Sequence, residues 1–151
     1  MKQIISELTF KTNGEGFLNI TESINNWISS EKLMKGILVI STLHTSCSLT
    51  INENADPDVL KDLSAFMKDL VPEDGFPLKK NPDQRYNYLH SSEGKDDMPA
   101  HIKTMLTCNN LSLSVNQGKL VLGVWQGVYL WEHRYLRNLR RLHMHAIGEL
   151  F

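Results

Sequence analysis

The chain has 151 residues, with 16 Lys and Arg against 17 Asp and Glu, and 41% of its residues are hydrophobic. This length fits one domain, residues 1–151, and the composition excludes a disordered, collagen-like or coiled-coil protein. Because the formal charge is only −1, nothing favours nucleic-acid binding, and the apolar runs are too short to span a membrane. With no signal-peptide stretch and only two cysteines, we expect a cytoplasmic protein.

Strands and one helix are predicted in turn along the first third of the chain. Apolar and polar residues alternate over 3–11, which indicates a half-buried strand, and a turn leads to a short extended piece at 17–20. Apolar residues at helical spacing then predict a helix over 20–28, with Thr21 as its N-cap. Two further strands are expected after it, at 36–42 and 46–51.

The rest of the chain continues this mixed pattern. Asp56-Pro57 is a helix start, and an apolar stripe predicts a helix over 59–70. Residues 71–97 lack clear periodicity, which is typical of a functional or mobile segment, and a helix capped by Asp97 follows at 98–106. The remaining strands are expected at 111–115, 119–131 and 142–146. We therefore predict a single α+β domain with a central, mainly antiparallel sheet or sandwich and a few covering helices.

Three segments concentrate polar residues, and the first follows the strand at 36–42. His44 and Cys47 are ligand types that suit zinc, although a hydrogen-bonded histidine and a buried thiol explain the same residues. Asp56 is explained as a helix cap, whereas Glu53 has no evident structural role.

The second segment runs from 88 to 101 and contains two histidines. His101 lies in the first turn of a helix, where the helix dipole disfavours a protonated ring, so it is available as a ligand or base. His90 lies on a loop eleven residues earlier, which is a loose spacing for a metal site. Each histidine alone is better explained as an ordinary hydrogen-bonded side chain.

The third segment covers residues 123–134. Gln126 interrupts an otherwise apolar strand and needs partners for its amide, and alternation places it on one face with Glu132 and Arg134. A guanidinium suits a phosphate or a carboxylate, so Arg134 is a candidate substrate anchor. The alternative is a polar edge face with a Glu132–Arg134 surface pair.

Together the three segments resemble a known family. HTSCSLTINENADPDV, YLHSSEGKDDMPAHIK and GVWQGVYLWEHR are similar, in order, to signature blocks of the YjbQ-like family, whose members carry the name secondary thiamine-phosphate synthase. The family often has Thr at Val124 and a small residue at Cys47, which makes Cys47 a weaker catalytic candidate. The resemblance implies an α+β homotrimer with a polar pocket near a subunit boundary, in which histidines gather and a metal can bind.

The activity that the resemblance implies joins hydroxymethylpyrimidine pyrophosphate to hydroxyethylthiazole phosphate and releases pyrophosphate. A divalent metal, an arginine and histidine donors would stabilise that leaving group, and the thiazole nitrogen needs no general base. The same residues suit a metal-dependent phosphate-ester hydrolase, or a trimeric protein that binds a small ligand or a metal without turnover. These alternatives stay open on the sequence alone.

The resulting site hypothesis combines the residues with the resemblance. His44, His90 and His101 are predicted to meet and bind a divalent metal, zinc by ligand preference, with magnesium or manganese as alternatives. Three protein ligands would leave a position for water or for an oxygen of a small phosphorylated substrate. The catalytic candidates are Glu53, Asp97, Glu132 and Arg134. The substrate-binding candidates are Cys47, Asp56, Gln126 and Arg134.

Overall fold

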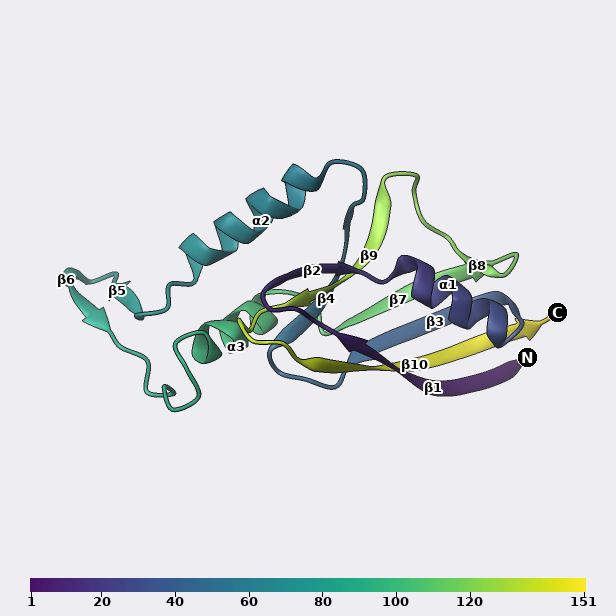
Figure 1. Cartoon of the computed structure of the whole chain (residues 1–151), viewed down its shortest axis with the longest axis horizontal. Helices are drawn as coiled ribbons and strands as arrows, with labels where there is room; N and C mark the ends of the chain where they lie inside the picture. Colours follow the sequence, from purple (N-terminus) through teal and green to yellow (C-terminus); the bar gives the residue numbers. More distant parts are fainter.

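The structure, a computed structural model, describes the whole chain as three helices and ten strands (Figure 1). In chain order the elements are β1 (Lys2–Lys11), β2 (Gly16–Asn19), α1 (Thr21–Ser30), β3 (Leu33–Thr42), β4 (Cys47–Glu53), α2 (Pro57–Leu70), β5 (Phe76–Leu78), β6 (Asn81–Tyr86), α3 (Asp97–Leu106), β7 (Asn110–Asn116), β8 (Lys119–Leu120), β9 (Gln126–Glu132) and β10 (Leu139–Leu150).

Two antiparallel sheets form the body of the molecule. The larger sheet has the order β1-β10-β3-β7-β8, and the smaller one has the order β2-β9-β4. In the smaller sheet β4 and β9 pair along their whole length, from Cys47 opposite Glu132 to Glu53 opposite Gln126. The predicted α+β class with a mainly antiparallel sheet is confirmed.

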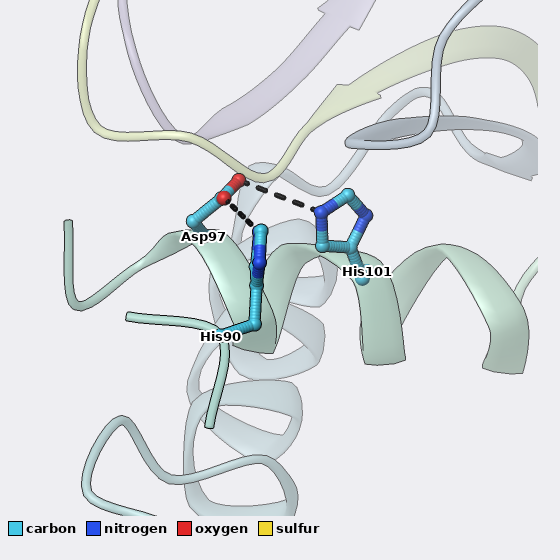
Figure 2. A group of neighbouring side chains, drawn as sticks. All are labelled: His90, Asp97 and His101. Atoms are coloured by element: carbon cyan, nitrogen blue, oxygen red, sulfur yellow. Dashed lines mark hydrogen bonds and ion pairs between the residues drawn. The ribbon is translucent and has the colours of Figure 1, made fainter. Parts of the chain in front are cut away.

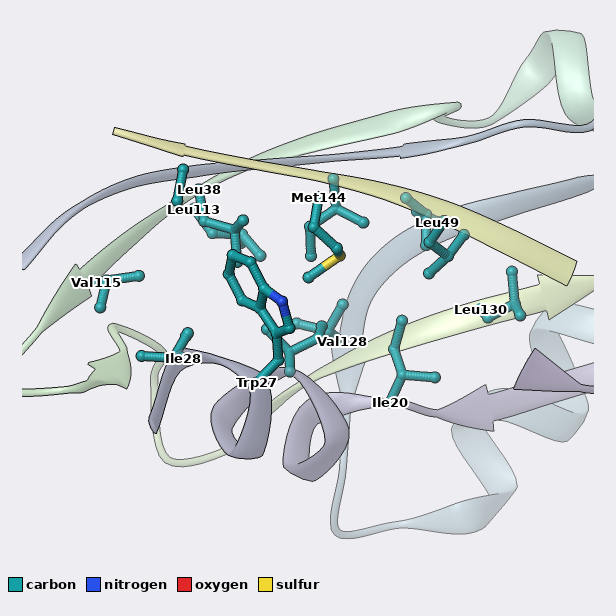
Figure 3. Close-up of a cluster of buried hydrophobic side chains, with 14 of the residues drawn as sticks. Ile20, Trp27, Ile28, Leu38, Leu49, Leu113, Val115, Val128, Leu130 and Met144 are labelled. Carbon is teal, nitrogen blue, oxygen red and sulfur yellow. The ribbon is translucent and has the colours of Figure 1, made fainter. Parts of the chain in front are cut away.

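The hydrophobic core lies between the two sheets and helix α1 (Figure 3). Four buried apolar residues begin or lie in α1 at i, i+4, i+7 and i+8, namely Ile20, Ile24, Trp27 and Ile28. They share the core with residues of both sheets, including Leu38, Leu113, Met144, Val128 and Leu130. Helical spacing on α1 and alternation on strands such as β10 therefore bury one face of each, whereas β9 is buried on both faces.

Three local predictions are wrong. Ile20, not Thr21, is the N-cap of α1, because the Thr21 hydroxyl accepts a hydrogen bond from the Val128 N–H (2.8 Å) and ties the helix to β9. The expected strand 119–131 is interrupted between β8 and β9, where the Gln126 side chain accepts from the Gly123 N–H. Asp97 is the first helical residue of α3 rather than its cap, since its carboxylate binds other side chains.

Helix α2 and the β5–β6 hairpin extend away from the body, and we call residues 57–86 the arm (Figure 1). The Asp56 carboxylate accepts from the Asp58 N–H (2.9 Å), so the predicted cap is confirmed. The hairpin lies inside the segment 71–97 that showed no periodicity, so part of that segment is regular. Only Met67 of α2 is buried, which leaves most of the arm exposed.

The three helices have 10, 14 and 10 residues. None of them combines the length and the apolar character that crossing a membrane requires.

Candidate functional site

Two histidines and one aspartate meet at the beginning of α3, and we call His90, Asp97 and His101 the Asp97 cluster (Figure 2). One ligand atom from each residue lies within 4.8 Å of the others. Asp97 and His101 are four residues apart and therefore share a face of the helix, while His90 comes from the loop before it. The His90 Nε2 lies 2.6 Å from Asp97 Oδ2, and the His101 Nε2 lies 3.7 Å from Asp97 Oδ1.

A backbone contact fixes the ring of His101. Its Nδ1 lies 3.1 Å from the carbonyl oxygen of Thr45, just before β4. Since a carbonyl only accepts, Nδ1 carries the hydrogen in the neutral ring, and Nε2 keeps its lone pair. That lone pair lies on the side of Asp97. The His101 Nε2 and the Asp97 Oδ1 are therefore two acceptors 3.7 Å apart, a separation that a metal ion could bridge. Metal-ligating histidines are typically oriented in this way by a bond from the other ring nitrogen.

Arg134 holds Asp97 from the other side. Its Nη1 donates to Asp97 Oδ1, its Nε to Asp96 Oδ2 (2.9 Å), and its Nη2 to the carbonyl of Glu93 (2.7 Å). The side chain of Asp97 is only 3% exposed, so this guanidinium compensates a buried charge. All three nitrogens of Arg134 already bind the protein, which leaves little of the fork for a phosphate.

A second buried ion pair lies behind Arg134. Glu132, whose side chain is 1% exposed, accepts from Arg140 through both carboxylate oxygens and from the Thr12 hydroxyl (2.9 Å). Its Oε1 also accepts from the Arg134 N–H (3.0 Å). The alternative of a Glu132–Arg134 surface pair is therefore wrong, because Glu132 is buried and its ionic partner is Arg140.

The sequence reasoning missed Arg140, although it left a signal. Arg140 has the same parity along β10 as the buried residues Leu142, Met144 and Ala146. A charged residue at a core-facing position of a strand requires a buried partner, since an unpaired buried charge is too costly.

His44 and Cys47 lie outside the Asp97 cluster. The His44 Nε2 accepts from the Arg141 N–H (2.8 Å), and burial together with the nearby Arg140 and Arg141 lowers its pKa. Cys47 is fully buried, and burial raises the pKa of its thiol to about 11, so it stays protonated at neutral pH. The structure thus brings together two of the three predicted metal histidines, with Asp97 in the place given to His44.

The remaining candidates lie at the other end of β4, in what we call the Glu53 turn (Glu53–Asp56 with Gln126). The Glu53 carboxylate accepts from the N–H groups of Ala55 (3.0 Å) and Asp56 (3.4 Å). Gln126 Oε1 accepts from the Gly123 N–H (2.7 Å). Because β4 has seven residues, this turn is about 20 Å from the Cys47 end of the strand.

A small open cavity adjoins the Asp97 cluster. Its volume is about 240 Å³, and it is lined by His90 and by residues of the loop around it, including Tyr88, Ser91 and Lys95. Lys95 belongs to none of the ion pairs of the structure. It is therefore a cation beside the cluster that could meet an anionic ligand.

Fold and cluster together define a class of protein, an α+β domain of two antiparallel sheets with a candidate metal centre at a helix start. The chain belongs to the UPF0047 (YjbQ-like) family, because residues 6–149 match the family model described as UPF0047 protein YjbQ-like.

Relatives and solved structures agree with this membership. The chain is 42% identical to the UPF0047 protein sll1880 of Synechocystis, over 95% of this chain and 90% of that protein. It is 38% identical to the UPF0047 protein YjbQ of Escherichia coli O157:H7, over 94% of this chain and 96% of that protein. The crystal structure of a YjbQ/UPF0047 protein of Clostridium acetobutylicum superposes with a TM-score of 0.78 at 31% identity, over 94% of this chain and 99% of that protein. These names state no activity.

Proposed function

We propose that this protein binds a divalent metal at the Asp97 cluster and uses it on a small phosphorylated substrate. The reaction we favour is that of a secondary thiamine-phosphate synthase, in which hydroxymethylpyrimidine pyrophosphate and hydroxyethylthiazole phosphate combine and pyrophosphate is released. The family resemblance supplies the reaction, and the geometry of the cluster supports the metal.

One observation carries the metal proposal. The Nε2 lone pair of His101 and the Oδ1 of Asp97 are two acceptors 3.7 Å apart, and the Nε2 of His90 donates to the other oxygen, Oδ2, of the same carboxylate, so a metal would replace that hydrogen. Two imidazoles and one carboxylate form a donor set that suits zinc better than magnesium, with manganese as an alternative. Three protein ligands leave a further position for substrate, as catalytic zinc sites do.

The charges around the cluster favour an anionic substrate. Arg134 compensates one of the two charges of Asp96 and Asp97. A divalent ion would then leave Asp96, Asp97 and Arg134 with one net positive charge, which favours a phosphate and stabilises a pyrophosphate leaving group. Two carboxylates also line the adjoining cavity, Asp74, which pairs with Arg85, and Glu73, which accepts from the Tyr135 hydroxyl. Lys95 lines the adjoining cavity and is the side chain we assign to a phosphate oxygen, because Arg134 is already engaged.

A phosphate-ester hydrolase is the second candidate, and one feature favours it. The side chain of His90 is 45% exposed and the cavity beside it is open, so water reaches the cluster. Hydrolysis needs such access, whereas transfer to a thiazole nitrogen needs water kept out.

The test combines metal binding with product analysis. Protein purified without chelator or histidine tag is titrated with zinc and assayed for pyrophosphate release from the pyrimidine substrate, with and without the thiazole phosphate. We expect the wild type to bind one zinc per chain, and His101→Ala to lose both zinc and activity. His143→Ala is the matched control, since His143 is a half-buried histidine on the outer face of β10.

The outcomes separate the candidates. Pyrophosphate release that depends on the thiazole phosphate and yields thiamine phosphate supports the transferase. Release of phosphate without the thiazole supports the hydrolase. If the wild type takes up no divalent ion supplied in excess, the metal proposal is wrong, and zinc uptake by His101→Ala equal to that of the wild type would contradict the ligand assignment.

We also propose that the protein is a homotrimer, as the resemblance implies. Ile5, Ile37 and Ile147 are 42–60% exposed on the outer face of the larger sheet. The two edge strands of that sheet, β1 and β8, have one unpaired side each. Light scattering should report three times the chain mass of 17.3 kDa, and a monomer mass at micromolar concentration would contradict the proposal.

A further inference from the structure

We infer that Arg134 is a positioning residue, held by the buried Glu132–Arg140 pair, which fixes the Asp97 carboxylate for the two histidines. This inference deepens the proposed function and rests on it where the readout is metal binding. It reassigns Glu132 and Arg134, which the sequence suggests as catalytic groups, and it adds Arg140.

The first step is how Arg134 connects separate parts of the chain. The residue follows β9, and its guanidinium donates to Asp96 and Asp97 at the beginning of α3 and to the Glu93 carbonyl of the preceding loop. These partners are 37 to 41 residues away in sequence. One planar side chain thus fixes both the helix start and the loop that carries His90 relative to the smaller sheet.

The second step is that Arg134 is itself fixed. The backbone N–H of Arg134 donates to Glu132 Oε1 (3.0 Å). Glu132 in turn forms a buried ion pair with Arg140, whose Nη2 also donates to the Ser46 hydroxyl (3.0 Å). Ser46 directly follows Thr45, whose carbonyl binds the His101 ring. The same buried pair therefore supports both the arginine that holds Asp97 and the segment that orients His101.

The third step excludes the other roles of these groups. Glu132 is 1% exposed, and both its oxygens accept bonds from the protein, so it neither reaches a substrate nor takes its proton. The Arg134 side chain is 19% exposed, and its three nitrogens already donate to two carboxylates and one carbonyl, so only the two N–H groups outside these bonds remain for a phosphate. These contacts favour positioning as the role of Arg134.

Loss of Arg134 has a defined consequence. Asp96 and Asp97 would face each other without a compensating cation at a nearly buried site, where like charges are costly. The Asp97 carboxylate would turn away from the histidines toward water. Partners that orient metal ligands are typically worth about 10–100-fold in metal affinity.

The experiment uses the full chain with Arg134→Gln and Arg134→Lys, and with Arg137→Gln as the matched control. Arg137 is exposed, lies three residues further along the chain and belongs to no ion pair. Two readouts are taken from each protein: zinc affinity by competition with a chelating dye, and the ring ¹H–¹⁵N signals of His90 and His101 in metal-free protein. Cooperative thermal unfolding shows that each variant is folded.

We expect Arg134→Gln to shift both ring signals and to weaken zinc binding about 10–100-fold. Arg134→Lys should recover only part of this, because an ammonium cannot form the fork. Arg137→Gln should match the wild type in both readouts. If a folded Arg134→Gln keeps the wild-type ring signals, the inference is wrong. If zinc binds to no protein, the proposed metal function fails, while the ring signals still decide the role of Arg134.

Discussion

The two ends of strand β4 both carry polar residues, but their charged side chains bind very different partners. In the Glu53 turn, the carboxylates of Glu53 and Asp56 accept from backbone N–H groups two or three residues away, while the Asn54 amide and the Glu53 carbonyl join the turn to β9. At the Asp97 cluster, His101 binds Thr45 at a separation of 56 residues, and Arg134 binds Asp97 at a separation of 37. Local bonds of the first kind stabilise turns and helix starts, whereas long-range bonds to a buried carboxylate build a site.

The first prediction is that a buried neutral histidine near the Cys47 end of β4 makes the free energy of unfolding fall at acid pH. His133, between Glu132 and Arg134 in the chain, is 1% exposed, its Nε2 lies 2.9 Å from the Ser48 hydroxyl, and burial lowers its pKa to about 3. Between pH 6.5 and 3 the unfolded ring binds a proton that the folded ring does not, so stability falls as pH falls through this window. The loss should be of the order of 4 kcal/mol by pH 3.

Denaturant unfolding at pH 7, 5 and 3 measures this loss. His133→Gln keeps a polar partner for Ser48 without a titrating ring, and its free energy of unfolding should depend less on pH. An equal decrease in both proteins would show that the acid sensitivity has another origin.

The second prediction contrasts one carboxylate from each end. Asp97→Asn should lower zinc affinity by more than the roughly 10–100-fold typical of a residue that only orients a ligand, because it removes a charged ligand on which both histidines converge. Glu53→Gln should change it less than twofold, since the Glu53 carboxylate only accepts from the nearby backbone N–H groups of Ala55 and Asp56. Isothermal titration with zinc measures both variants. Equal losses would mean that the two ends of β4 do not differ as we describe.

The third prediction is that a substitution in the Glu53 turn lowers stability and leaves zinc affinity unchanged. Asp56→Ala removes the side-chain cap of α2 and should lower the free energy of unfolding by about 1 kcal/mol. Zinc affinity should stay at the wild-type value. Urea unfolding checks the first outcome, and a change in zinc affinity would show that the capped turn contributes to the site.

The smallest expected effect concerns the cavity beside His90. Lys95→Gln should raise the KM for a phosphorylated substrate severalfold, the range of an exposed ionic contact below about 1 kcal/mol. Lys80→Gln, on the exposed hairpin of the arm, is the control. An unchanged KM would remove Lys95 from the substrate site while leaving the metal proposal intact.

Much of the fold follows from local patterns in the sequence. The alternation of β1, the apolar spacing of α1 and the Asp56-Pro57 start of α2 each express a rule of one element. The β5–β6 hairpin escapes such rules, because Asn81–Tyr86 is fully exposed and has no apolar face to alternate. The break between β8 and β9 depends on how the Gln126 side chain folds back, which spacing does not reveal.

The site was predictable only in part. His90, Asp97 and His101 stand out by residue type, but spacing alone gave no reason to prefer Asp97 over His44 as their neighbour. That choice depends on Arg134, whose guanidinium donates to Asp97 from just after β9, and on Arg141, whose backbone N–H donates to the His44 Nε2. Such contacts between distant segments are set by tertiary packing. The alternation of β10 nevertheless places Arg140 on the buried face of the strand and so predicts a buried charge.

Anomalous diffraction at the zinc absorption edge, on crystals grown with zinc, tests the central claim most directly. The account predicts one strong peak per chain, within about 2.0–2.2 Å of His90 Nε2, His101 Nε2 and an Asp97 oxygen. No peak at this position, or a peak bound instead by the His143–His145 pair on the outer face of β10, would contradict it.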